Sequence, residues 1–178
     1  MISKLITIQT LLAQELQNLY SAENQLIHAL PKIAQATTSE NLKHAFENHW
    51  TQTKNHVQRL RRVANCLEES TSGKYCKVME SLIAEWSELI EERGETFKGE
   101  YNDIDAGLIC TAQKVNHCKI AAYASVKALA EALDFTEVVE ILKQTLKEEH
   151  SAILHLTEIA QSINRAGAAV IQRMNEQI

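Results

Sequence analysis

The sequence predicts an all-α protein, and two observations lead to this prediction. Only 5 glycines and 1 proline occur among 178 residues, which is too few for the many tight turns of a barrel or a sandwich. Apolar residues also recur at steps of three and four over most of the chain, which is the spacing of one helix face. One domain is expected at this length, and it is long enough to bury a substantial core.

The apolar stripes predict four long helices and one shorter one. They are expected over residues 3–36, 40–68, 76–97, 103–133 and 135–164. Ser39 follows a short polar turn and is a good N-cap for the second helix. The residues from Arg165 onward mix small and polar side chains, so we treat 1–164 as the bundle and 165–178 as a tail that frays or continues as a loose helix.

The lengths of the connections indicate how these helices are arranged. A short turn joins the first long helix to the second, and another joins the third to the fourth, so the four form two hairpins. The connection between the hairpins is long and carries the short helix. This pattern matches ferritin-like connectivity better than a simple up-and-down bundle.

Composition excludes several classes of partner. Lys and Arg number 18 against 23 Asp and Glu, a net charge of −5, which argues against nucleic acid as a partner. No run of 18 apolar residues occurs, so we expect no membrane association through a spanning segment. Four cysteines without a CxxC pair are typical of a reduced, cytoplasmic protein.

Polar residues interrupt the apolar stripes near the middle of each long helix. The interruptions are Glu23, His49, His56, Lys119 and Glu149, with Gln52 and Asn116 flanking the same faces. A lone Glu in a stripe more often reaches water at a helix edge, and a lone His is more often a hydrogen-bonded core residue. Because all four long helices carry a polar residue in the middle of their apolar stripe, we predict instead a shared buried polar cluster. Di-metal carboxylate sites in helical bundles are built from such clusters.

Ordered segments along nearly the whole chain resemble the YciE/YciF-type ferritin-like proteins of bacteria. The segments are Leu19–Leu26, Ala29–Lys32, Ala45–His49, Met79–Glu85, Ala112–His117, Ala121–Tyr123 and Thr145–Glu149. The resemblance implies a four-helix ferritin-like fold, a homodimer, a link to stress responses and a di-iron centre.

The chain departs from that family at the positions where a metal would be held. Carboxylates that the resemblance implies are replaced by Gln52, Asn116, Lys119 and Ile153. Glu23, His56 and Glu149 remain as candidate metal ligands.

These departures favour a metal-free remnant in which Lys119 is the internal counter-ion of Glu23 and Glu149. His49, Gln52 and Asn116 complete the expected polar cluster, and no cofactor is expected. We interpret the protein as non-catalytic, working through its dimer or through the surface that meets another protein. The alternative is an iron oxidase or ferroxidase with a reduced ligand set, because two carboxylates and one imidazole resemble the facial triad of non-haem iron.

Overall fold

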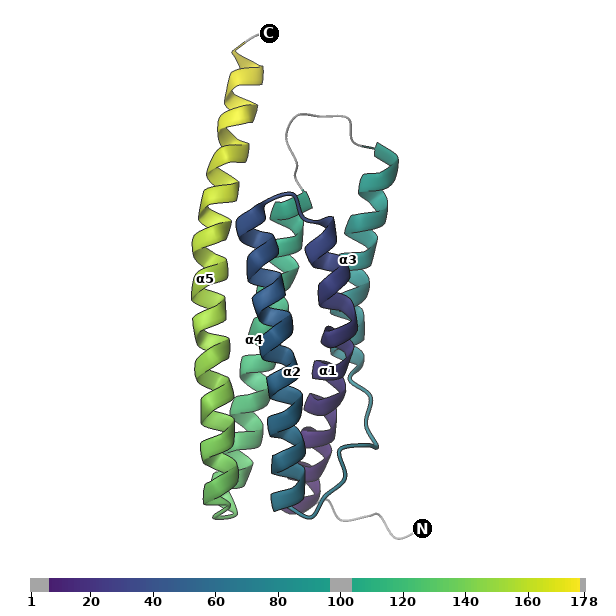
Figure 1. The fold of residues 1–178 in the computed structure, drawn as a ribbon, viewed down its shortest axis with the longest axis vertical. Coiled ribbons are helices and arrows are strands. Elements are labelled where there is room, and N and C mark those ends of the chain that lie inside the picture. Colours follow the sequence, from purple (N-terminus) through teal and green to yellow (C-terminus); the bar gives the residue numbers. More distant parts are fainter. Residues whose placement is uncertain (1–6, 97–103, 177–178) are drawn as a thin grey trace.

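A computed structural model describes residues 7–96 and 104–176, and every regular element in these ranges is a helix (Figure 1). The helices are α1 (Ile8–Ala36), α2 (Glu40–Cys66), α3 (Lys77–Thr96), α4 (Ile104–Ala132) and α5 (Thr136–Asn175). The predicted fold class is confirmed. Among the described residues, no helix is both long enough and apolar enough to cross a bilayer.

Two antiparallel hairpins form the bundle. Helix α1 packs on α2 and α4 packs on α5, and the hairpins meet through α1 against α4 and α2 against α5. The crossover from α2 to α4 runs the length of the bundle and carries α3, which lies outside the four-helix square against α1 and α4 (Figure 1).

The turns between helices are set by their capping residues. Ser39 is the N-cap of α2, as predicted, and its side chain accepts a hydrogen bond from the Leu42 backbone N–H. The carboxylate of Asp105, at the start of α4, accepts four hydrogen bonds from the α1–α2 turn, donated by Thr37, Thr38 and Ser39. One buried side chain therefore ties the two hairpins together at this end of the bundle.

The last helix runs further than the bundle boundary at Asn164 predicts. Of the two outcomes expected for the residues from Arg165 onward, fraying or continuing as a helix, the structure has the second, because α5 continues to Asn175 and extends past the ends of its neighbours (Figure 1). The segment beyond Asn164 contains a single glycine, Gly167, and no proline. One glycine costs a helix only about 1 kcal/mol, so nothing in this segment stops the helix that the bundle has already started.

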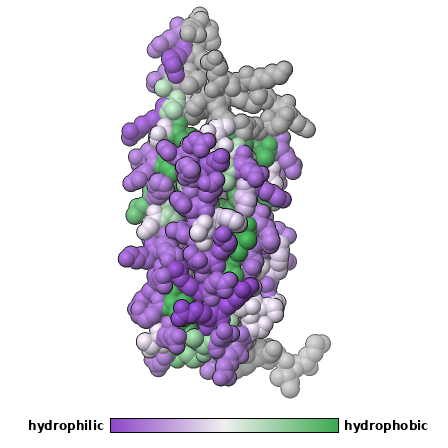
Figure 2. Space-filling view, viewed as in Figure 1, coloured by the Kyte–Doolittle hydropathy of each residue, from purple (hydrophilic) through white to green (hydrophobic). Residues whose placement is uncertain are grey.

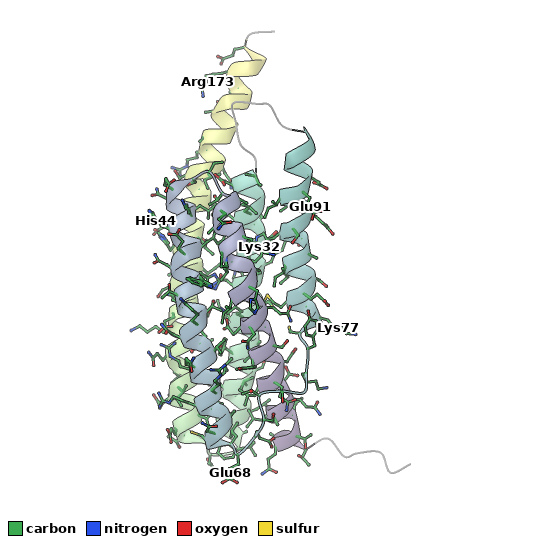
Figure 3. All side chains as sticks on the ribbon, turned by 45° about the vertical axis from the view of Figure 1, so that its right-hand side comes forward. Lys32, His44, Glu68, Lys77, Glu91 and Arg173 are labelled. Atoms are coloured by element: carbon green, nitrogen blue, oxygen red, sulfur yellow. The ribbon has the colours of Figure 1, made fainter. Side chains whose placement is uncertain are left out.

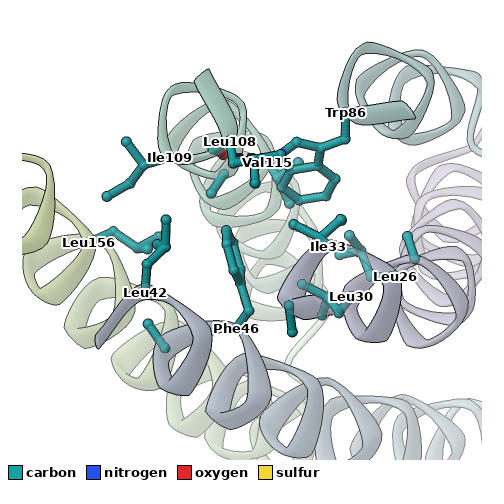
Figure 4. Close-up of a cluster of buried hydrophobic side chains, with 14 of the residues drawn as sticks. Leu26, Leu30, Ile33, Leu42, Phe46, Trp86, Leu108, Ile109, Val115 and Leu156 are labelled. Carbon is teal, nitrogen blue, oxygen red and sulfur yellow. Dashed lines mark hydrogen bonds between the residues drawn. The ribbon is translucent and has the colours of Figure 1, made fainter. Parts of the chain in front are cut away.

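The core consists of two apolar clusters, one toward each end of the bundle. In the first, Phe46 and Trp86 meet edge to face with ring centroids 6.3 Å apart (Figure 4). The second gathers Leu12, Leu16 and Leu60 with Val126 and Leu142. In α2, α4 and α5 the residues between the clusters are the polar ones singled out above, so a polar layer separates the two parts of the core.

Charged side chains cover the outside of the bundle. The view in Figure 2 is mostly hydrophilic, with apolar residues scattered singly over it. Figure 3 shows His44, Lys77 and Arg173 on outward faces of their helices. Such a surface is normal, and it leaves the interior polar layer as the feature that requires a functional explanation.

Candidate functional site

Six of the seven polar residues singled out from the sequence lie together in the polar layer. They are Glu23, His49, His56, Asn116, Lys119 and Glu149, and none is more than 5% exposed. The seventh, Gln52, is half-buried. It lines a pocket beside His49 and makes no hydrogen bond or ion pair with the layer in the part of the chain that the structure describes.

Lys119 is the cation at the centre of the layer. Its Nζ atom lies 2.6 Å from Glu149 Oε1 and 3.1 Å from Glu23 Oε2. The third contact is with His49 Nε2, at 3.2 Å. The ammonium therefore forms an ion pair with each carboxylate and a hydrogen bond with the His49 ring.

His56 is the second link between the carboxylates. Its Nδ1 atom is 3.3 Å from Glu23 Oε1 and 3.2 Å from Glu149 Oε1. Its Nε2 atom is 2.9 Å from Glu148 Oε2. Both ring nitrogens face carboxylate oxygens, which is the environment of an imidazolium with two N–H donors.

Two further side chains complete the hydrogen bonding of the carboxylates. The Tyr123 hydroxyl donates to Glu23 Oε1 at 2.8 Å, and the Asn116 amide donates to Glu149 Oε2 at 2.9 Å. Glu23 Oε1 and Glu149 Oε2 accept these hydrogen bonds, whereas Glu23 Oε2 and Glu149 Oε1 have only ion-pair contacts, with Lys119 and His56. Pairing with opposite charge is what allows charged groups to be buried.

The environment shifts the pKa values of these groups so that their charges balance. Burial alone would raise the pKa of Glu23 and of Glu149, but Lys119 and His56 outweigh it and hold both below the ordinary value. Burial lowers the pKa of Lys119, but Glu149 and Glu23 raise it above its usual range.

The two histidines are shifted in opposite directions. Burial lowers the pKa of His56, but its close contacts with the Glu149 and Glu23 carboxylates raise it to about 9. Burial and the Lys119 charge lower the pKa of His49 to about 4. At neutral pH two carboxylates thus face one ammonium and one imidazolium, and His49 is neutral.

This arrangement does not fit a resident metal ion. Glu23, His56 and Glu149 each offer one ligand atom, and these atoms lie within 4.8 Å of one another. However, the Lys119 ammonium contacts both carboxylates, so a metal cation would have to displace it. The displaced charge would then stay close to the metal in a site with low dielectric screening.

Sequence reasoning missed the outer part of the site. Arg59 makes two bonds of 2.7 Å to the Glu148 carboxylate, which contacts His56. Burial raises the pKa of Glu148, but Arg59 and His56 lower it below its usual range. The available signal was position: Arg59 follows His56 by three residues, so both share one face of α2.

Five buried polar atoms have no hydrogen-bond partner among the described residues. Three of them, Glu23 Oε2, His56 Nδ1 and Glu149 Oε1, have ion-pair contacts within the polar layer. The other two are Thr53 Oγ1 and Asn116 Oδ1, and both residues are fully buried. The second is where the resemblance implies a carboxylate. The Asn116 amide nitrogen donates to the Glu149 carboxylate at 2.9 Å and to the Glu149 backbone carbonyl at 3.5 Å, and the amide oxygen has no partner among the described residues.

Comparison with known proteins identifies relatives over most of the chain. A family model described as a domain of unknown function, DUF892, matches residues 7–169. Protein YciF of Escherichia coli is 39% identical over 158 residues, which is 86% of this chain and 90% of YciF.

Solved structures agree with this relationship. The crystal structure of the E. coli stress protein YciF superposes with a TM-score of 0.82 at 35% identity, covering 90% of this chain and 99% of YciF. A ferritin-like, diiron-carboxylate protein of Bacillus anthracis shares the fold, with a TM-score of 0.65 at 16% identity over 88% of this chain and 99% of that one. The chain is therefore a ferritin-like helical bundle that belongs to the DUF892 family, together with YciF.

Proposed function

We propose that this protein is a stress-associated bundle in which an internal ion-pair network has replaced a di-metal site. In this proposal it acts in the cytoplasm as a homodimer or through the surface that meets another protein, and not by catalysis. The stress association rests on the relationship to YciF, which is described as a stress protein. The observation that carries the loss of the metal is Lys119, whose ammonium bonds both buried carboxylates.

The charge balance supports this reading. Two hard cations need several carboxylates, because anionic oxygen ligands offset their charge. Here two carboxylates are already balanced by Lys119 and His56. Adding a divalent ion to a neutral, buried group of side chains leaves its charge uncompensated, which is costly.

A second candidate function is an oxidase or ferroxidase with a reduced iron site. The grouping of Glu23, His56 and Glu149 favours it, because two carboxylates and an imidazole can hold one iron ion. This function requires Lys119 to move away from both carboxylates when iron enters.

Metal analysis of matched variants distinguishes the two functions. The native protein is compared with a variant that restores three carboxylates, Gln52→Glu, Asn116→Glu and Lys119→Glu. A control, Lys119→Met, removes the ammonium without adding a ligand. Each protein is incubated with Fe(II) without oxygen and desalted, and its iron content is then measured by elemental analysis.

The proposal predicts no stoichiometric iron in the native protein and iron uptake by the triple variant. The Lys119→Met control separates loss of the ammonium from gain of ligands, and it is expected to take up less iron than the triple variant. Stoichiometric iron in the native protein, abolished by His56→Gln, would establish the alternative and direct attention to reactions with oxygen or peroxide.

A further inference from the structure

A pocket between α2 and α5 reaches the polar layer from outside. Its volume is about 170 Å³. The polar residues that line it are Asn48, His49, Gln52, Ser151 and His155. The apolar part of its wall includes Phe46 and Leu156, which also belong to the first core cluster.

His49 connects this pocket to the buried charges. Its Nε2 atom contacts the Lys119 ammonium, and because Lys119 can only donate, Nε2 is the acceptor. A neutral imidazole has one proton, so that proton is on Nδ1. Among the described residues, His49 Nδ1 makes no hydrogen bond. His49 is 5% exposed and lines the pocket, and its contact with Lys119 leaves Nδ1–H as the free donor of the ring.

The charges around the pocket select a neutral ligand. Asn48, Gln52 and Ser151 carry no charge, and the Ser151 hydroxyl already donates to the Lys147 carbonyl, so its oxygen is left to accept. His155 stands at the exposed rim, 3.9 Å from Glu158. Behind His49 the charges of the polar layer cancel. An anion would meet no cation among the lining residues that is free of a carboxylate, and a cation without a lone pair, such as an amidinium, could not accept a hydrogen bond from His49.

The volume sets the size of the ligand. An engineered apolar cavity of about 150 Å³ is large enough for benzene, so this pocket suits molecules of up to roughly six heavy atoms. The amide groups of Asn48 and Gln52 offer both donors and acceptors. The pocket therefore matches a small neutral molecule with a carbonyl or hydroxyl oxygen for His49 and a donor for the rim.

We infer that the α2–α5 pocket is a binding site for small neutral amides or hydroxyl compounds, oriented by the Nδ1–H group of His49. This inference goes beyond the proposed function. It concerns a different ligand, and its test does not depend on whether the polar layer binds iron.

Three isosteric probes test this site, namely acetamide, acetate and acetamidinium. Acetamide is neutral with an acceptor oxygen, acetate is an anion, and acetamidinium is a cation without an acceptor. Each is titrated into the full chain at pH 7 while the ring resonances of His49 are followed by NMR. With so few atoms, acetamide is expected to bind with a Kd on the order of millimolar.

Two pocket variants and one matched control give the result its location. Ala152→Phe fills the pocket from α5, and Ser151→Trp fills it from the exposed rim. If one of these variants does not fold, the other still tests the pocket. Ala124→Phe adds the same side chain at an exposed position of α4 outside the pocket. All three keep His49.

The inference predicts a saturable shift of the His49 resonances with acetamide, at least tenfold weaker binding of acetate and acetamidinium, and loss of the shift in the pocket variants but not in Ala124→Phe. No saturable shift in the native chain overturns it. Equal binding of the three probes, or unchanged acetamide binding in both pocket variants, also overturns it.

Discussion

Removing the Lys119 ammonium is the perturbation whose effect follows most directly from the contacts of the polar layer. In Lys119→Met an apolar chain of similar length fills the same space. Glu23 and Glu149, which are both fully buried, then share only the positive charge of His56. Removing one partner of a buried ion pair typically costs about 3 to 5 kcal/mol, and we expect a loss of unfolding free energy in that range.

The loss should depend on pH in a defined direction. Without Lys119, one buried carboxyl has no positive charge of its own, so its folded-state pKa rises above its unfolded value. Protonation relieves the repulsion at low pH, and stability falls as pH rises. The variant should therefore be closer to the native protein at pH 5 than at pH 8.

Urea unfolding followed by circular dichroism measures the effect. A double variant, Lys119→Met with Glu149→Gln, restores the charge balance and should recover part of the loss. Lys143→Met is the surface control, because Lys143 forms an exposed ion pair with Glu140 and such pairs contribute about 0.5 kcal/mol or less. A Lys119→Met variant as stable as Lys143→Met, or one equally destabilised at both pH values, would refute the reasoning.

Two further predictions concern the histidines and the turn that holds the hairpins together. His56 has a folded-state pKa raised to about 9, so the stability that it contributes is fully present below pH 6.5 and is lost as pH rises through 9. His49 has a folded-state pKa lowered to about 4, so its contribution is present above pH 6.5 and is lost as pH falls toward 4. Each of these two pH-dependent changes corresponds to about 3 kcal/mol. The free energy of unfolding, measured with urea from pH 4 to 9, should therefore be largest near pH 6.5, and His56→Gln should remove its decrease above that pH. A free energy of unfolding that does not change with pH would contradict this. Asp105→Ala removes four hydrogen bonds from the 37–39 turn and should lower the free energy of unfolding by about 3 kcal/mol. Asp105→Asn should lower it less. An unchanged midpoint of thermal unfolding in Asp105→Ala would show that the turn does not need this side chain.

Much of the fold could be predicted because it depends on periodicity and on capping. The apolar stripes predicted the ends of α1, α2 and α4 to within a few residues among the described positions, although α5 runs eleven residues past Asn164, and Ser39 marked the start of α2 correctly. The role of Asp105 could not be predicted, because it caps a turn more than 60 residues away in sequence. Long-range hydrogen bonds of this kind leave no local pattern.

The site was predictable where a polar residue interrupts an apolar stripe, as Glu23 and Lys119 do. Gln52 was expected in the polar layer only because it flanks the same face, and it lines a pocket instead, since a residue at the edge of a stripe can turn either way. Glu148 and Arg59 escaped notice for the converse reason. They lie at the border of their helix faces, where charged residues are ordinarily solvated.

Anomalous diffraction from crystals soaked in Mn(II) tests whether the Lys119 ammonium holds the place of a metal. We expect no anomalous peak between Glu23 and Glu149, with Lys119 Nζ within about 3.5 Å of both carboxylates, as ordinary hydrogen-bond distances allow. A peak coordinated by Glu23, His56 and Glu149, with Lys119 withdrawn from both, would contradict it.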